Sequence, residues 1–234
     1  MRSYGPYVAF ALASLAPAAA AVPQKAVEQN EAFVLRHPDH PTFISRSFGR
    51  AIAADDELIL IGEWETSYQP VFNRWIYAFD TGTGEHLWRL ENPLYDEAAA
   101  NGFGYAIELS PGRIAVGAPR ALDDEGNETG SVFIFDRVSR ELIQTVVPTE
   151  GTPDRIGTSK LALSDEILAS GMPSYEDETQ DNQFYNSGLV LVFDPRTGEL
   201  LARFDPENPD FNLELGRSLV IAGGLLTIGS RDYV

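Results

Sequence analysis

The chain has 234 residues, with 17 Lys and Arg against 35 Asp and Glu, which gives a formal net charge of −18. So negative a chain is a poor partner for nucleic acids and for anionic membrane surfaces, because phosphate groups need cationic neutralisation. Cysteine is absent, which excludes disulfides and thiolate metal sites, so stability must come from packing.

An export signal is predicted at residues 1–21. Arg2 precedes an apolar stretch that begins at Val8 and ends in a run of alanines, and cleavage after Ala21 fits the small-residue rule. The stretch contains Pro17 and is shorter than the roughly 20 residues that a membrane helix needs. We therefore expect a secreted, periplasmic or cell-surface protein without a membrane span in its mature chain.

Residues 22–47 form an N-terminal segment before the repeats. Its sequence FVLRHP at 33–38 is similar to LARFDP at 201–206, which predicts that residues 33–36 form a fourth strand that closes a ring of sheets. His37 and His40, beside Asp39, could bind a metal ion. Two histidines near a proline are more often exposed polar residues, and we predict no metal site here.

From residue 48 onward, a glycine preceded by an apolar residue recurs at intervals of about 55 residues. In each unit a second glycine follows at a nearly fixed distance and ends an apolar stretch. The first set is Gly49, Gly104, Gly157 and Gly216, and the second set is Gly62, Gly117, Gly171 and Gly229. A fixed phase of this kind indicates structural repeats that stack on one another.

Each unit contains apolar stretches of strand length separated by turn residues. The third stretch ends on an aspartate, which is Asp80, Asp136 or Asp194, and turn residues follow it directly. β-Branched and aromatic residues are frequent in these stretches, which predicts strands joined by antiparallel turns. We expect four strands in each of units 48–102, 103–155 and 156–214, two strands in the partial unit 215–234, and no helix after the signal.

The fold predicted is an all-β propeller built of four-stranded antiparallel blades. A lone sheet of this kind cannot bury both faces, and radial packing of blades solves the problem. Three complete blades and a partial fourth would then belong to a larger propeller of about six to eight blades. A closed ring of four blades and a β-sandwich are the alternatives. A sandwich, however, does not require glycines and aspartates at the same positions in each unit.

Unit two resembles the FG-GAP repeat of integrin-α-like propellers. The resemblance rests on FGYA at 103–106, IAVGAP at 114–119 and GSVFIFD at 130–136, and the other units carry weaker versions. It implies a propeller of the exported bacterial kind that serves in binding or adhesion. Integrin-type repeats hold calcium between the first two strands of a blade. The corresponding turns here are short and lack alternating carboxylates, so those calcium sites are not carried over.

Two acidic loops fall between the second and third predicted strands of units two and three. Their candidate binding residues are Asp123, Asp124, Asn127, Glu128, Glu176 and Asp177. Oxygen-rich loops can hold calcium, but without the spacing of a known calcium loop a solvated rim is the more common case. We therefore expect no cofactor and no metal, with calcium in these loops as the alternative.

A second resemblance covers AFDTGTGEHLW at 78–88. It is similar to the tryptophan-docking motif of PQQ-dependent quinoprotein dehydrogenases and of their non-enzymatic propeller relatives. That motif implies a structural tryptophan at Trp88, stacked between neighbouring blades. Units two and three have Gln144 and Ala202 in its place.

No catalytic residues are predicted, because the chain has no Gly-x-Ser-x-Gly elbow and carboxylate pairs alone do not indicate a glycosidase in so acidic a protein. The function expected is a non-catalytic extracytoplasmic scaffold that binds a protein or a glycan. A quinoprotein-like oxidoreductase and an envelope-assembly scaffold are the alternatives. The aromatic residues of the predicted loops would form a binding rim or cover blade edges, and they are Trp64, Tyr68, Tyr175 and Tyr185.

Overall fold

The computed structural model of the protein describes residues 35–39, 48–63, 74–95, 101–123, 125–147, 160–175, 186–206 and 212–231. The chain divides into two units, 1–34 and 35–234, and every described residue belongs to the second. The predicted signal peptide therefore lies outside the described residues. Within those ranges all regular elements are strands, and no helix is long and apolar enough to cross a membrane.

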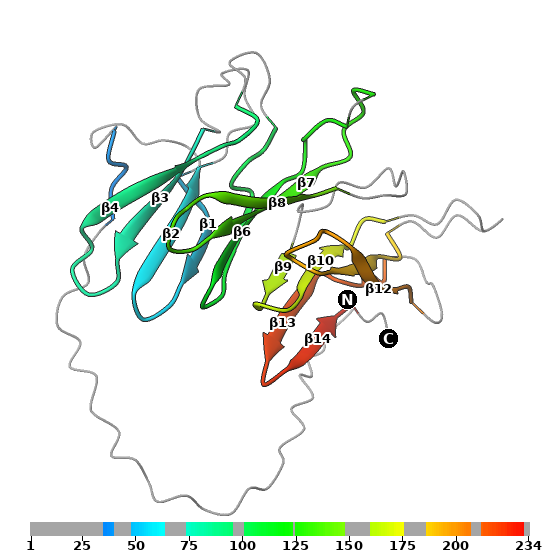
Figure 1. The fold of residues 1–234 in the computed structure, drawn as a ribbon. Coiled ribbons are helices and arrows are strands. Elements are labelled where there is room, and N and C mark those ends of the chain that lie inside the picture. Colours follow the sequence, from blue (N-terminus) through cyan, green and yellow to red (C-terminus); the bar gives the residue numbers. More distant parts are fainter. Residues whose placement is uncertain are drawn as a thin grey trace, which may run out of the picture. The chain divides into compact units, whose positions relative to one another are not determined.

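Four antiparallel sheets follow one another along the chain, each built from consecutive strands (Figure 1). Sheet one contains β1 (Phe48–Ala54), β2 (Leu58–Glu63), β3 (Trp75–Asp80) and β4 (His86–Glu91). Sheet two contains β5 (Ala106–Leu109), β6 (Arg113–Ala118), β7 (Ser131–Asp136) and β8 (Leu142–Val146). Sheet three contains β9 (Lys160–Leu163), β10 (Leu168–Met172), β11 (Leu189–Phe193) and β12 (Leu200–Phe204), and sheet four contains β13 (Ser218–Ala222) and β14 (Leu225–Gly229).

Three four-stranded sheets and a two-stranded one repeat the same up-and-down order. This confirms the predicted all-β fold with its repeated, propeller-like blade architecture. Each sheet also has the number of strands expected for its unit.

Successive sheets pack face to face, so the middle strands are buried on both sides. In β7, Phe133 and Phe135 contact the core between sheets one and two, whereas Val132 and Ile134 contact the core between sheets two and three. This double burial explains why β7 is a continuous apolar run and does not alternate with polar residues.

The outward faces of the first and last described sheets differ in how they are covered. On sheet four, Val220 and Leu225 are 52% and 72% exposed. On sheet one, the outward-facing Tyr77 and Phe79 are buried, and Leu35 packs against them. Leu35 and the adjacent Arg36 are the described half of the predicted ring-closing strand, and neither lies in a strand.

Glycine pairs allow adjacent sheets to approach closely. A Cβ atom on Gly62 would overlap the carbonyl oxygen of Gly104, and one on Gly171 would overlap that of Gly216. Gly104 and Gly216 also have φ angles of +90° and +86°, which other residues rarely adopt. The second glycine of one unit thus contacts the first glycine of the next. This contact gives a physical reason for the phase that the two glycine sets keep, although Gly157 lies outside the described residues.

The aspartate that ends each third strand orders the turn after it. Asp80 Oδ1 accepts hydrogen bonds from the backbone N–H groups of Gly82 and Thr83, at 3.0 and 2.7 Å. Asp136 repeats this arrangement. At Asp194, hydrogen bonds from the side chain and backbone of Arg196 lower the carboxyl pKa to about 2. These aspartates are therefore turn-forming residues.

Candidate functional site

The two ends of the sheets differ in what connects their strands. Antiparallel pairing places the β1–β2 and β3–β4 turns of sheet one, and their equivalents in the other sheets, at one end. The β2–β3 loops, their equivalents and the connections between sheets lie at the opposite end. We call these the turn end and the loop end.

At the turn end, Arg137 joins sheet two to sheet one. Its guanidinium lies 2.5 Å from Asp55 Oδ2 and 3.3 Å from Glu57 Oε2, and it donates to the Ser110 carbonyl oxygen at 3.1 Å. Partial burial raises the pKa of Asp55, but the hydrogen bonds from Arg137 and from backbone N–H groups outweigh this and lower it. The side chain of Arg137 is only 11% exposed. The ion pair with Asp55 is therefore partly shielded from water.

Asp165 joins sheet three to sheet two at the same end. Its Oδ1 atom accepts hydrogen bonds from Ser110 Oγ at 2.6 Å and from the Gly112 N–H at 3.0 Å. Arg113 Nη1 donates to the Asp165 carbonyl oxygen at 2.5 Å. The polar groups of these turns thus bond to the neighbouring sheet.

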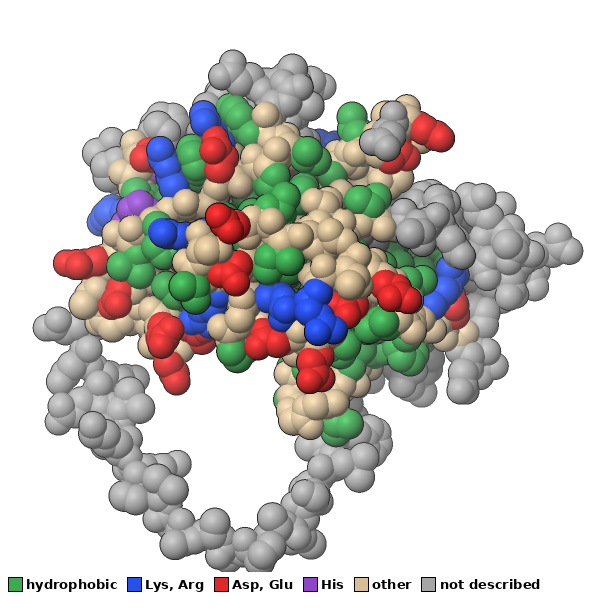
Figure 2. All heavy atoms as spheres, in the orientation of Figure 1, with side chains coloured by type: hydrophobic (Ala, Val, Ile, Leu, Met, Phe, Trp, Pro, Cys, Tyr) green, Lys and Arg blue, Asp and Glu red, His purple; other side chains and the backbone are tan. Residues whose placement is uncertain are grey.

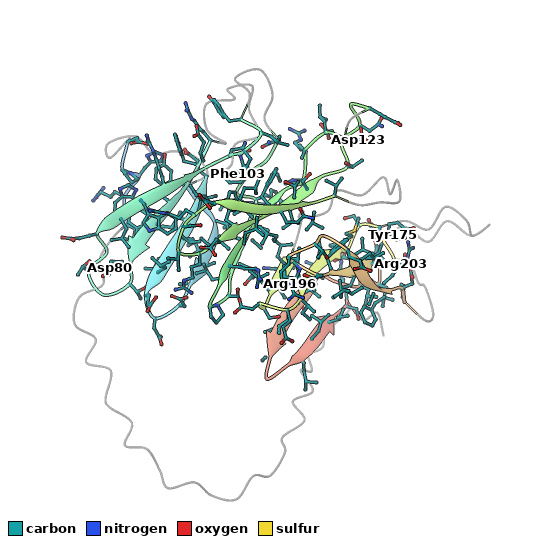
Figure 3. All side chains as sticks on the ribbon, viewed as in Figure 1. Asp80, Phe103, Asp123, Tyr175, Arg196 and Arg203 are labelled. Carbon is teal, nitrogen blue, oxygen red and sulfur yellow. The ribbon has the colours of Figure 1, made fainter. Side chains whose placement is uncertain are left out.

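The acidic loop of unit two is closed by hydrogen bonds of its own. Asp123 Oδ1 accepts from the backbone N–H groups of Glu125 and Asn127, and its Oδ2 accepts from the Asn127 side chain. The backbone hydrogen bond from Asn127 is the largest cause of the lowered Asp123 pKa. Glu128 forms a β-bridge with Leu122. Figure 3 shows Asp123 on a loop away from the turn that carries Asp80.

The remaining candidate residues of the acidic loops, Asp124, Glu176 and Asp177, lie outside the described residues. In the part of the chain that the structure describes, no group of three or more His, Cys, Asp or Glu side chains is placed to hold a metal ion.

His37 has a buried partner. Its Nε2 atom lies 3.1 Å from Glu63 Oε2, and the exposed fractions of the two residues are 5% and 3%. The neighbouring Asp39 accepts hydrogen bonds from the Tyr77 hydroxyl at 3.0 Å and from Arg89 at 3.1 Å. Burial, and then the bond to Asp39, raises the pKa of the Tyr77 phenol. These contacts hold residues 35–39 against sheet one, while His40 lies outside the described residues.

Trp88 lies between sheets. It packs against the core shared by sheets one and two, and the Arg140 guanidinium of the next unit is 5.6 Å from its ring centroid. The equivalent Gln144 of unit two donates from Nε2 to the carbonyl oxygen of Thr197 in unit three, at 2.5 Å. The position therefore makes an inter-sheet contact in both units.

Of the four aromatic residues expected in loops, only Tyr175 is described. It is half-buried against the core of sheets two and three, and Arg203 donates to its hydroxyl at 3.2 Å (Figure 3). Trp64, Tyr68 and Tyr185 lie outside the described residues.

A pocket of about 800 Å³ lies at the loop end, where the first strands of successive sheets are neighbours. Its volume is in the range of sites for small ligands. Strands β1, β5 and β9 form its walls, together with the residues that lead into β13 and a loop of unit three. The polar lining residues are Arg50, Tyr105, Glu108, Lys160, Ser174, Asn186, Glu214 and Arg217.

Two of the basic residues in the pocket have partners in its wall. Arg50 Nη2 donates to the Tyr105 hydroxyl at 2.8 Å, and its guanidinium lies 4.7 Å from the centre of that ring. Arg217 forms an ion pair with Glu214, and Arg231 also pairs with Glu214, at 3.3 Å. The wall therefore holds these cations in place.

Glu108 and Lys160 form the other charged part of the pocket wall. Glu108 is half-buried, and among the described residues neither its carboxyl group nor the Lys160 ammonium has a hydrogen bond or ion pair. Burial raises the pKa of Glu108 to about 7, and the charge of Lys160 opposes this rise. The carboxyl group therefore changes its charge near neutral pH.

No motif in the sequence predicts this pocket. Its one signal was the presence of charged residues in otherwise apolar first strands, where Glu108 and Lys160 stand. The acidic loops drew attention because their charges are consecutive in the chain, whereas Arg50, Glu108 and Lys160 come from three different units.

No protein-family model matches the chain, and neither does any curated protein. Among solved structures it is similar to the computationally designed Ika8 protein and to a chain of the mitotic checkpoint complex, each 17% identical. The alignments cover 78% and 77% of this chain, with TM-scores of 0.46 and 0.48. The chain spans 42% and 44% of the length of those two chains.

Proposed function

We propose that this protein is a non-catalytic binding scaffold, exported from the cell and built as a propeller of the FG-GAP kind, that binds a glycan or a protein segment at its loop end. The observation that carries the proposal is the pocket of about 800 Å³ among the first strands. A cavity of this size accommodates a few sugar rings or a short peptide.

The difference between the ends of the sheets supports this location. At the turn end, Arg137 and Asp165 bond to neighbouring sheets and contribute to stability. At the loop end, the polar side chains of Glu108 and Lys160 face the pocket. Binding residues commonly lie at such ends, on loops and strand ends that a rigid scaffold positions.

The arrangement of the first strands supports a propeller. Strand β1 contacts β5, β5 contacts β9, and β9 contacts β13, while each sheet packs on the next. In a propeller, the first strands of the blades line a common centre in this way. The quinoprotein alternative has no comparable support, because the packing of Trp88 between sheets is a structural feature that the motif shares with non-enzymatic propellers.

A blocked pocket tests the proposal. Ser174 is exposed and lines the pocket, so Ser174→Trp should fill its mouth without disturbing the core. The matched control is Val138→Trp, because Val138 is 84% exposed in a turn-end hairpin. We expect the wild type and the control to bind members of a glycan array or a peptide array, and the Ser174 variant to lose that binding. The proposal is wrong if neither array yields a ligand whose binding depends on Ser174.

A further inference from the structure

We propose that the loop-end pocket recognises an oxyanion on its ligand, namely a carboxylate, sulfate or phosphate group. Lys160 contacts the oxyanion, and the protonation state of Glu108 controls the affinity for it. This inference rests on the proposed function and names the chemical class of its ligand. An acidic glycan carries such groups, and so does a free inorganic anion.

The charges that line the pocket favour an anionic ligand. The chain as a whole carries a formal charge of −18. The pocket differs, because three basic side chains line it, those of Arg50, Lys160 and Arg217, against the two carboxyl groups of Glu108 and Glu214. An anionic ligand repelled by most of the surface would therefore find a favourable potential here.

Lys160 is the cation in the pocket that is available to a ligand. Arg217 is engaged by Glu214, and Arg50 is held against Tyr105. Lys160 is exposed at the start of β9, and no other described residue is bonded to its ammonium group. An ammonium group offers three donors to an oxyanion. Lys160 is accordingly the contact residue.

Glu108 lies on β5, the strand next to β9. The charged and titratable groups around it in the pocket are Arg50 and Tyr105, Lys160 on β9, and Glu214 with Arg217 before β13. When Glu108 is ionised, it neutralises Lys160 and repels an anion. When it is protonated, it can donate a hydrogen bond to the ligand. Anion binding is therefore coupled to proton uptake.

The coupling has a definite sign and size. With the Glu108 pKa at about 7, the carboxyl group is almost fully protonated at pH 5.5. At pH 8.5 only about one molecule in thirty is protonated, by the ordinary titration relation. Affinity for an oxyanion should therefore fall as pH rises, by up to about 30-fold across this interval.

Calorimetric titrations of the full chain at pH 5.5 and 8.5 test the inference. The probes are galacturonate oligosaccharides, the matching neutral galactose oligosaccharides and inorganic sulfate, whose charges stay constant across this interval. We expect the acidic oligosaccharide to bind at least about tenfold more tightly than the neutral one at pH 5.5, and to weaken at pH 8.5. Inorganic sulfate that binds equally well, with the same pH dependence, would support recognition of the oxyanion alone.

Variants assign the two roles. Lys160→Gln should lose at least about tenfold in affinity for the oxyanion, and Lys160→Arg should retain most of it. Glu108→Gln should bind at pH 8.5 as tightly as at pH 5.5, because the group no longer titrates. Arg196→Gln, on an exposed turn-end residue, is the matched control and should behave as wild type. Thermal melts of each variant confirm that it is folded.

The outcomes separate this inference from the proposed function. In one outcome, neutral oligosaccharides bind as tightly as acidic ones and lose this binding in Ser174→Trp. That result would overturn the oxyanion inference and leave the proposed function standing. A pH-independent wild type would overturn the role of Glu108, and an unchanged Lys160→Gln variant would overturn that of Lys160. Failure of every probe, together with arrays that show no Ser174-dependent binding, would overturn both proposals.

Discussion

The turn end and the loop end of this protein are built from the same repeats but use their polar residues differently. At the turn end, Asp55, Arg137 and Asp165 bond across to the neighbouring sheet. At the loop end, close sheet contacts rely on glycine, and charged side chains line a pocket. The same repeat can thus use polar side chains to join its sheets at one end, and at the other end join them through glycines and leave polar side chains to a ligand.

Ion pairs on the exposed surface should contribute less to stability than the contacts between sheets. On the face drawn in Figure 2, acidic and basic side chains lie beside one another across much of the surface. Exposed pairs of this kind contribute little, typically less than about 1 kcal/mol each. The partly shielded pair of Arg137 and Asp55 should matter more than its exposed counterparts, and the glycine contacts should matter most.

The largest expected effect comes from disturbing the glycine contacts at the loop end. In Gly171→Ala, the added methyl group would overlap the backbone of Gly216, and we expect a loss of about 3 kcal/mol or more in the free energy of unfolding. Gly82→Ala at the turn end is the matched control, since the nearest atom to the added methyl group, Asp80 Oδ1 of the same turn, would be 3.4 Å away. Urea denaturation measures both variants. Equal stability of the two would contradict the role assigned to the contact.

A smaller effect is expected from removing the inter-sheet ion pair at the turn end. Arg137→Met should cost about 2 kcal/mol near neutral pH, because Asp55 keeps a charge but loses its partner. Arg196→Met, whose arginine side chain is 61% exposed, should cost less than about 0.5 kcal/mol.

The pH dependence of the Arg137 variant sharpens the test. Because the folded-state pKa of Asp55 is lowered, the stability it contributes is present above its unfolded pKa, near 3.9, and is lost as pH falls through the folded value. The difference between wild type and Arg137→Met should therefore shrink below about pH 3.5. A difference that stays constant down to pH 2 would mean that packing, and not the ion pair, causes the loss.

The smallest effect concerns a strained turn. Arg140 has a φ angle of +65°, where the equivalent positions in units one and three carry Gly84 and Gly198. Arg140→Gly should raise the free energy of unfolding by up to about 1 kcal/mol, because glycine adopts this conformation without strain. The lost contact between Arg140 and Trp88 reduces this gain. Arg140→Ala removes the same contact and keeps the strain, so it should be less stable than both. Chemical denaturation of the three proteins in parallel measures these differences. Equal stability of Arg140→Ala and Arg140→Gly would refute the prediction.

Much of the fold could be predicted because its information is local. The continuous run of apolar and largely aromatic residues at 75–79 specifies a strand, and Asp80 with Thr83 specifies the turn that follows. Gly104 and Gly216 kept phase for a physical reason that became visible only when their contacts with the preceding sheets were known.

The candidate site could not be predicted in the same way. The acidic run that begins at Asp123 was conspicuous in the chain, yet its first carboxylate is used within its own loop. Arg50, Glu108 and Lys160 do not occupy equivalent positions in their units, so comparing repeats does not bring them together. His37 was considered as an exposed residue and is instead buried against Glu63.

The amino-acid sequence is enough to place the strands, the turns and the order of the sheets, because apolar runs of strand length and turn-forming residues act over a few residues. Only the tertiary structure decided which side chains meet in the pocket and which carboxyl group loses enough water to change its pKa. Those properties depend on how three sheets pack, and Glu108 acquires its environment from residues more than fifty positions away in the chain, near Arg50 and Lys160.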